Sequence, residues 1–153
     1  MDLSSHFTLD EFVASQTAAR EHISNAPGPD VIVNLKATAQ LLEQVRGLLG
    51  KPVIVSSGYR SPALNAAVRG AKDSAHLYGL AVDFIAPQYG SPIAICQLLK
   101  GASLMFDQLI FEHTWVHIAL AKNGGTNRHQ LLTAHFGNGP TQYTNGFAQS
   151  ASA

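Results

Sequence analysis

Three side chains of the kind that binds metals stand where an ordinary domain would carry other residues. Asp83 interrupts the apolar run LAVDFI, and His117 interrupts the run WVHIAL. A carboxylate buried in such a strand is costly unless it is paired or bound to a metal. His76 lies just before the first of these runs. Two imidazoles and one carboxylate suit Zn²⁺, and three protein ligands leave a position for a water that the metal makes acidic.

Each of these residues also has a simpler interpretation. A single histidine beside an apolar strand is usually a structural residue with a satisfied ring, and Asp83 alone would fit an ion pair with Arg60 or Arg69. The constellation favours the metal, because two strand interiors each carry a ligand-type residue. The attacking water also needs a proton acceptor. Glu112 is the candidate, since it stands just before the turn that leads into the His117 run.

The elements that must position these residues alternate between helices and short strands. Periodicity, capping patterns and Gly/Pro punctuation predict helices over 9–15, 31–49, 62–69 and 92–100. Apolar, β-rich runs predict strands over 51–56, 80–85, 106–112 and 115–120, the last two as a hairpin. The sequence therefore predicts an α+β fold with helices packed on a small, mostly antiparallel sheet.

The predicted elements all lie in residues 1–122, which we expect to form the domain that carries the zinc site. Residues 123–153 are polar and rich in Gly, Asn and Thr, and the final NGFAQSASA resembles a frayed tail. A length of 153 residues fits one domain. We therefore expect residues 123–153 to be a polar C-terminal extension or tail of that same domain.

Charge and hydropathy exclude several classes of function. Ten basic residues balance ten acidic ones, whereas phosphate binding needs a basic stripe, so we expect no nucleic-acid partner. No apolar run approaches the roughly 20 residues of a membrane span, and we expect no membrane partner. The N-terminus MDLSSHFTLDEF has no basic and apolar leader pattern, so we expect no signal peptide.

Three segments together resemble a known family. SSGYRSPALN (56–65), SAHLYGLAVDF (74–84) and WVHI (115–118) are similar, in this order, to the signatures of the zinc D-Ala-D-Ala carboxypeptidases and related peptidoglycan endopeptidases of peptidase family M15. The resemblance spans about residues 6–120. It implies the fold shared by Hedgehog-type signalling domains and DD-peptidases. It also implies one Zn²⁺ per chain, with His76, Asp83 and His117 as the ligands.

The resemblance assigns further roles and contains one departure. Arg60 matches an arginine that faces substrate and polarises a carbonyl or holds a carboxylate, and Ser74 matches a substrate-contacting position. Gln108 is a further candidate for a substrate contact. Many family members carry the catalytic acid three positions before the last histidine, where this chain has Thr114. Glu112 is then the equivalent only if the turn brings it back over the metal.

The implied substrate is the stem peptide of peptidoglycan, cut at either the D-Ala-D-Ala or the L-Ala-D-Glu bond. A monomeric phage lysin or virion-associated enzyme, made in the cytoplasm and acting on the cell wall after release or delivery, is the expected setting. Two other interpretations stay open. The chain is a zinc-containing but inactive module that binds wall peptides or builds a phage, or it binds no metal and Asp83 pairs with Arg60.

Overall fold

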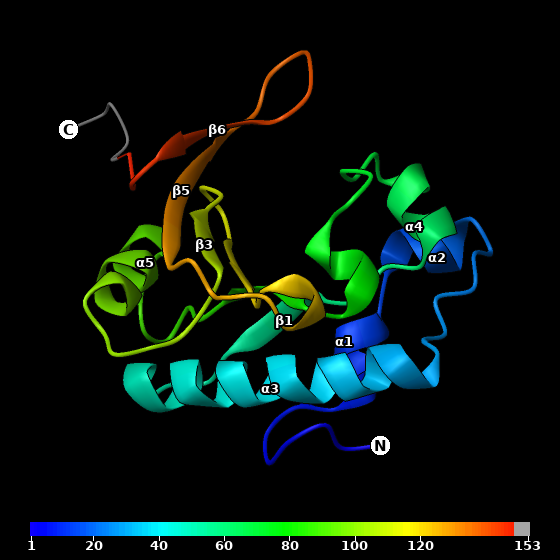
Figure 1. Cartoon of the computed structure of the whole chain (residues 1–153), viewed down its shortest axis with the longest axis horizontal. Coiled ribbons are helices and arrows are strands. Elements are labelled where there is room, and N and C mark those ends of the chain that lie inside the picture. The colour runs from blue at the N-terminus through cyan, green and yellow to red at the C-terminus, as the bar shows by residue number, and fades with distance from the viewer. Residues whose placement is uncertain (149–153) are drawn as a thin grey trace.

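Residues 1–148, which the structure describes, fold into a six-stranded sheet with helices packed against it (Figure 1). The structure is a computed structural model. Its helical elements are α1 (Leu9–Val13), α2 (Gln16–Arg20), α3 (Pro29–Leu49), α4 (Pro62–Ala67), η1 (Ala75–Tyr78), α5 (Pro92–Lys100) and η2 (Lys122–Gly124). Its strands are β1 (Ile54–Ser57), β2 (Ala81–Ile85), β3 (Gln108–Phe111), β4 (Val116–Ala119), β5 (Gln130–His135) and β6 (Gln142–Asn145). The predicted α+β class is confirmed.

The sheet is open and mostly antiparallel. Its strands lie in the order β1-β2-β4-β3-β5-β6, and only the contact between β3 and β5 is parallel. β3 and β4 are consecutive, adjacent and antiparallel, so the predicted hairpin is confirmed. β2 lies on the other side of β4, which places the Asp83 strand directly beside the His117 strand.

Strand pairing gives the sheet two different faces. Residues paired on neighbouring strands point to the same face, and successive residues point to opposite faces. Phe84, Val116 and Phe111 form one row and belong to the apolar core shared with α3 and α5. The adjacent row points away from that core and consists of Ser57, Asp83, His117, Ile110, Leu132 and Asn145. We call the face with this second row the site face.

The helix α3 supplies much of the core (Figure 1). Pro29 occupies its first turn, and Gly50 ends it with a left-handed backbone at φ +66°, as glycine allows. Leu35, Leu42 and Leu49 repeat on one stripe and are buried. Burying each such leucine stabilises the fold by about 1.5–3 kcal/mol relative to an exposed one. The predicted helices over 31–49 and 92–100 are confirmed, with the first starting two residues earlier.

The N-terminal helix prediction over 9–15 is wrong at its end. α1 stops at Val13, because the Ser15 side chain accepts a hydrogen bond from the Ala18 backbone N–H and so begins a new helix, α2. Capping of this kind is a strong start signal. The two short helices run along the β1 side of the sheet, where α1 contacts β1 and α2 contacts α4.

The C-terminal region contains two strands that the sequence analysis does not predict. β5 and β6 extend the sheet beyond β3. The segment after β6 is also tied to the sheet, because the Gly146 backbone N–H donates to the Leu131 carbonyl and Thr133 Oγ1 donates to the Gly146 carbonyl. The predicted frayed tail therefore does not begin at Asn145. Its residues 149–153 lie outside the described residues.

Candidate metal site and substrate cleft

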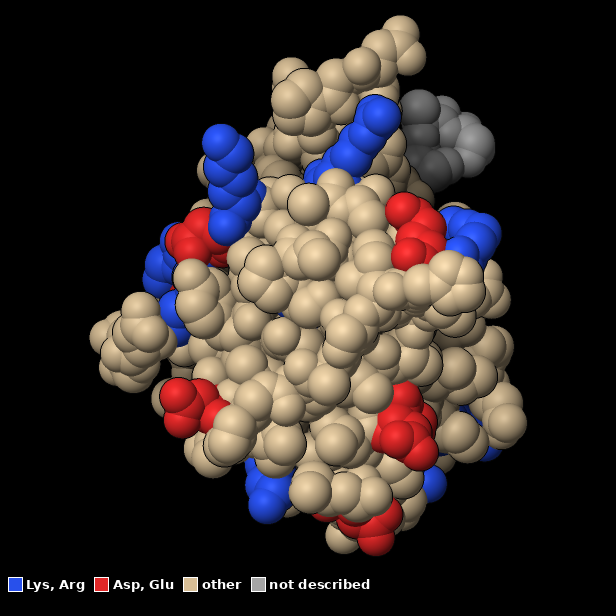
Figure 2. All heavy atoms as spheres, turned by 90° about the vertical axis from the view of Figure 1, so that its right-hand side faces the viewer, with Lys and Arg blue, Asp and Glu red and all other residues tan. Residues whose placement is uncertain are grey.

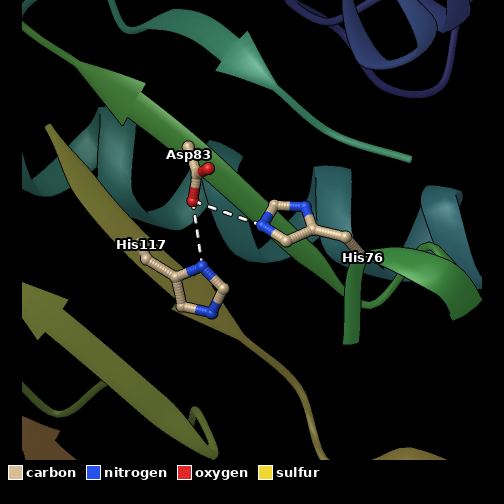
Figure 3. A group of neighbouring side chains, drawn as sticks. All are labelled: His76, Asp83 and His117. Atoms are coloured by element: carbon tan, nitrogen blue, oxygen red, sulfur yellow. Dashed lines mark hydrogen bonds and ion pairs between the residues drawn. The ribbon is translucent and has the colours of Figure 1, made fainter. Parts of the chain in front are cut away.

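The three predicted metal ligands meet on the site face (Figure 3). Asp83 Oδ1 lies 2.9 Å from His117 Nδ1 and 3.4 Å from His76 Nε2. One ligand atom from each residue lies within 4.8 Å of the other two. One metal ion can therefore be reached by two imidazole nitrogens and a carboxylate oxygen, the donor set that zinc accepts.

The hydrogen bonding of His76 fits a metal ligand. His76 Nδ1 lies 2.6 Å from the Gly58 carbonyl oxygen, which can only accept, so this nitrogen carries the proton. The lone pair of a neutral His76 ring is then on Nε2, which points at Asp83. His76 Nε2 and Asp83 Oδ1 are then two acceptors 3.4 Å apart, unless a cation or a second proton lies between them. A backbone carbonyl that fixes the far nitrogen in this way is the usual support of a metal-bound histidine.

Asp83 is held in its charged form. Burial by itself raises the pKa of a carboxyl group, but the nearby imidazoles of His76 and His117 outweigh burial and hold the pKa of Asp83 well below its usual range. Within residues 1–148, the ion-pair partners of Asp83 are these two histidines, and it forms no pair with Arg60 or Arg69. The interpretation of Asp83 as the partner of an arginine is therefore wrong.

Glu112 lies beside this cluster. Its Oε2 is 3.9 Å from His117 Nδ1 and accepts a hydrogen bond of 3.0 Å from the indole N–H of Trp115. Burial, and then the negative charge of Asp83, raise the pKa of Glu112 to about 7. A carboxyl group with such a pKa can both take and give a proton near neutral pH. Thr114 is exposed, whereas Glu112 is buried and lies beside the predicted metal ligand His117.

The cluster lies in a cleft of about 600 Å³. Arg60, Ser74 and Gln108 also line it. Ser74 Oγ accepts a hydrogen bond of 3.3 Å from Arg60 Nη2 and caps η1 through the His76 backbone N–H. Gln108 donates to Gln130 at 2.8 Å on the same face. The structure thus brings every predicted site residue to one cleft.

A close backbone contact behind His76 is possible only because residue 58 is glycine. A Cβ at Gly58 would overlap the carbonyl oxygen of Phe12 in α1, and that oxygen also accepts a hydrogen bond from the Tyr59 backbone N–H at 2.7 Å. The approach of α1 to β1 therefore fixes the position of the Gly58 carbonyl, and with it the ring of His76.

Gly58→Ala is expected to lower the stability by about 1–3 kcal/mol, since overpacking of a close contact costs this much. It is also expected to weaken zinc binding, because the Gly58 carbonyl that orients His76 moves. Thermal unfolding with and without added Zn²⁺ measures both effects. Gly47→Ala is the matched control, since a Cβ there meets nothing within 4 Å. Equal melting temperatures for the two variants would contradict the packing argument.

Sequence reasoning missed residues that the structure adds to the cleft. Trp115 donates a hydrogen bond from its indole N–H to Glu112. Tyr143 of β6 and Phe136, which follows β5, also line the cleft. Leu132 lies on the site face, in the same row as Asp83 and His117. The sequence signal for β5 was weak, because the run QLLTAH at 130–135 does not alternate regularly between apolar and polar residues.

Charge is mixed on the face of the molecule drawn in Figure 2. Lys and Arg, and Asp and Glu, are spread around its margin, with uncharged residues across its middle. Within the described residues, no helix combines the length and the apolar character that a membrane crossing requires.

A metal cluster with a buried glutamate at the floor of a cleft is the arrangement of a metal-dependent hydrolase. The family model for Peptidase M15 matches residues 5–119. The match covers more than half of the chain, so the chain belongs to peptidase family M15, whose members are zinc peptidases. No curated protein matches the sequence closely enough to count as a relative.

Proposed function

We propose that this chain is a zinc-dependent peptidase that hydrolyses an amide bond in the stem peptide of peptidoglycan. The bond is either the terminal D-Ala-D-Ala bond, cut by a carboxypeptidase, or the L-Ala-D-Glu bond, cut by an endopeptidase. One observation carries the proposal: His76, Asp83 and His117 converge, with Glu112 3.9 Å from His117, in a chain of family M15.

The residues divide the work of hydrolysis. His76, Asp83 and His117 would hold one Zn²⁺, which supplies the Lewis acidity that makes water a nucleophile at neutral pH. Glu112 accepts the proton of the attacking water and returns it to the leaving amine. Its raised pKa supports both transfers.

Arg60 binds the substrate in the cleft that holds the three proposed metal ligands. Burial lowers the pKa of its guanidinium, and the negative charges of Asp83 and Glu112 oppose that shift. Its Nε is buried without a partner among the described residues. A planar cation with a free donor suits a substrate carbonyl or carboxylate. Ser74 holds Arg60 in place and, with Gln108, lines the path of the peptide.

The stem peptide is proposed from the signature segments that the chain shares with family M15. We propose that the enzyme acts on the cell wall as a monomer, in the setting of a phage lysin or a virion-associated enzyme. A module that binds wall peptides without cutting them is the second candidate, and the departure at Thr114 is what favours it.

Hydrolysis of purified peptidoglycan with and without a chelator tests the proposal. We expect about one zinc per chain, release of new amino groups, and loss of that release on chelation. Mass analysis of the fragments names the bond. Zinc binding without hydrolysis would favour the binding module, and a protein that binds no zinc would overturn both.

A further inference from the structure

The last strand of the sheet places a tyrosine on the site face. β3 and β5 are parallel, and their pairing ends with Phe111 beside Thr133, one residue before Glu112 and Ala134. Ala134 is paired with Tyr143 of β6. Ala134 lies two residues after Leu132, so Ala134 and its partner Tyr143 point to the site face.

The Tyr143 side chain lies in the cleft. It lines the same cavity as the metal cluster and is 51% exposed. Burial, and then the charges of Glu112 and Asp83, raise the pKa of its phenol, whereas Arg60 lowers it. The hydroxyl is therefore protonated at neutral pH and lies within electrostatic reach of all three charged groups. Among residues 1–148, nothing hydrogen-bonds it.

The neighbours of Tyr143 form a second wall of the cleft. Phe136, Pro140 and Thr141, between β5 and β6, line the cavity, as does the segment after α4 that includes Arg69 and Asp73. In Figure 1 the loop between β5 and β6 lies at the top of the view, and the segment that follows α4 lies below it and to the right. Phe136 stacks on Trp115 with ring centroids 5.7 Å apart and planes at 26°. The wall therefore contacts Trp115, whose indole N–H donates to Glu112.

This wall lies outside the segment that defines the family. The family model ends at residue 119, whereas β5 and β6 begin at Gln130 and Gln142. Substrate contacts from this wall are therefore features of this chain and not of the matched segment.

We propose that Tyr143 is a substrate-binding residue, whose hydroxyl donates a hydrogen bond to a backbone carbonyl of the peptide bound in the cleft that Arg60 also lines. The inference rests on the proposed function. A carbonyl is the expected partner because the adjacent protein groups, Glu112 and Asp83, are acceptors that a substrate carbonyl must avoid. Tyr143 and Arg60 would both supply donors to the substrate backbone in this cleft.

Tyr143→Phe removes the hydroxyl and keeps the ring. We expect kcat/KM for stem-peptide hydrolysis to fall about 10-fold, the effect of one lost hydrogen bond to substrate, with zinc content and melting temperature unchanged. Tyr89→Phe is the matched control. Tyr89 packs partly buried against the core and does not line the cleft, so its variant should keep wild-type activity.

Calorimetric binding of a stem peptide gives a second readout. In a Glu112→Gln background, Tyr143→Phe should weaken binding by a similar factor. Wild-type kcat/KM and affinity in Tyr143→Phe would overturn the inference while leaving the peptidase proposal intact. A wild-type protein that binds peptide without hydrolysis would refute the peptidase, and weaker binding by Tyr143→Phe would then still support the inference. A protein that neither cuts nor binds the peptide would refute both.

Discussion

His117→Ala is expected to abolish both zinc binding and peptidase activity. His117 Nδ1 lies 2.9 Å from Asp83 Oδ1 and 3.9 Å from Glu112 Oε2, so this ring contacts the proposed carboxylate ligand and lies near the proposed general base. Loss of outer-shell partners alone weakens metal sites about 10–100-fold. Loss of a ligand should exceed that. We expect zinc affinity to fall at least about 100-fold and hydrolysis to become undetectable.

Thermal unfolding separates loss of the metal from loss of the fold. A ligand present at 100 times its Kd stabilises the native state by about 2.7 kcal/mol. In a domain of this size, that corresponds to a rise in Tm of roughly 5–10 °C. Wild type should show this rise when Zn²⁺ is added to the stripped protein, and His117→Ala should unfold cooperatively without it.

His135→Ala serves as the control for the loss of an imidazole. His135 lies on the same sheet but is exposed and bonds Thr144, so its variant should keep zinc, the Tm rise and activity. Stoichiometric zinc in purified His117→Ala would show that the metal binds elsewhere.

The metal cluster could be predicted from the sequence because its members break a simple pattern. Asp83 and His117 each interrupt an apolar strand, and the cost of burying such groups implies a shared purpose. The β-strand period of two then puts both on one face once β2 pairs with β4. That pairing itself was not predicted, since β2 and β4 are separated by α5 and β3.

The C-terminal wall could not be predicted for a related reason. β5 joins the sheet through a parallel contact with β3, about twenty residues away along the chain. Such a contact leaves no turn signal of the kind that marks a hairpin. Tyr143 looked like a residue of a polar extension because only tertiary structure brings it into the cleft that Glu112 also lines.

The roles of the GYRS segment came from resemblance, and the structure gives them physical causes. Gly58 permits the approach of α1 and presents its carbonyl to His76. Ser61 caps α4. Arg60 is aimed into the cleft between these two fixed points, where Ser74 holds one of its nitrogens. A four-residue motif thus positions both the proposed metal ligand His76 and the proposed substrate-binding residue Arg60.

Glu112→Gln is expected to leave zinc bound and to lower kcat about 10²–10⁴-fold, the usual contribution of a general base. Glutamine has nearly the same shape, and its amide oxygen can still accept the 3.0 Å hydrogen bond from Trp115. It cannot take a proton from water. Zinc content, the Zn²⁺-dependent rise in Tm and the rate of amino-group release should be measured on one preparation.

Thr114→Ala is the decisive companion variant. Position 114 carries the catalytic acid in many family members, but here it is an exposed threonine, and its removal should leave the rate unchanged. Near-wild-type activity in Glu112→Gln would mean that another group moves the proton, and hydrolysis would then need a different base. Loss of activity with zinc retained, confined to Glu112, would show that the turn between β3 and β4 moves the base two positions upstream in sequence while keeping it beside His117.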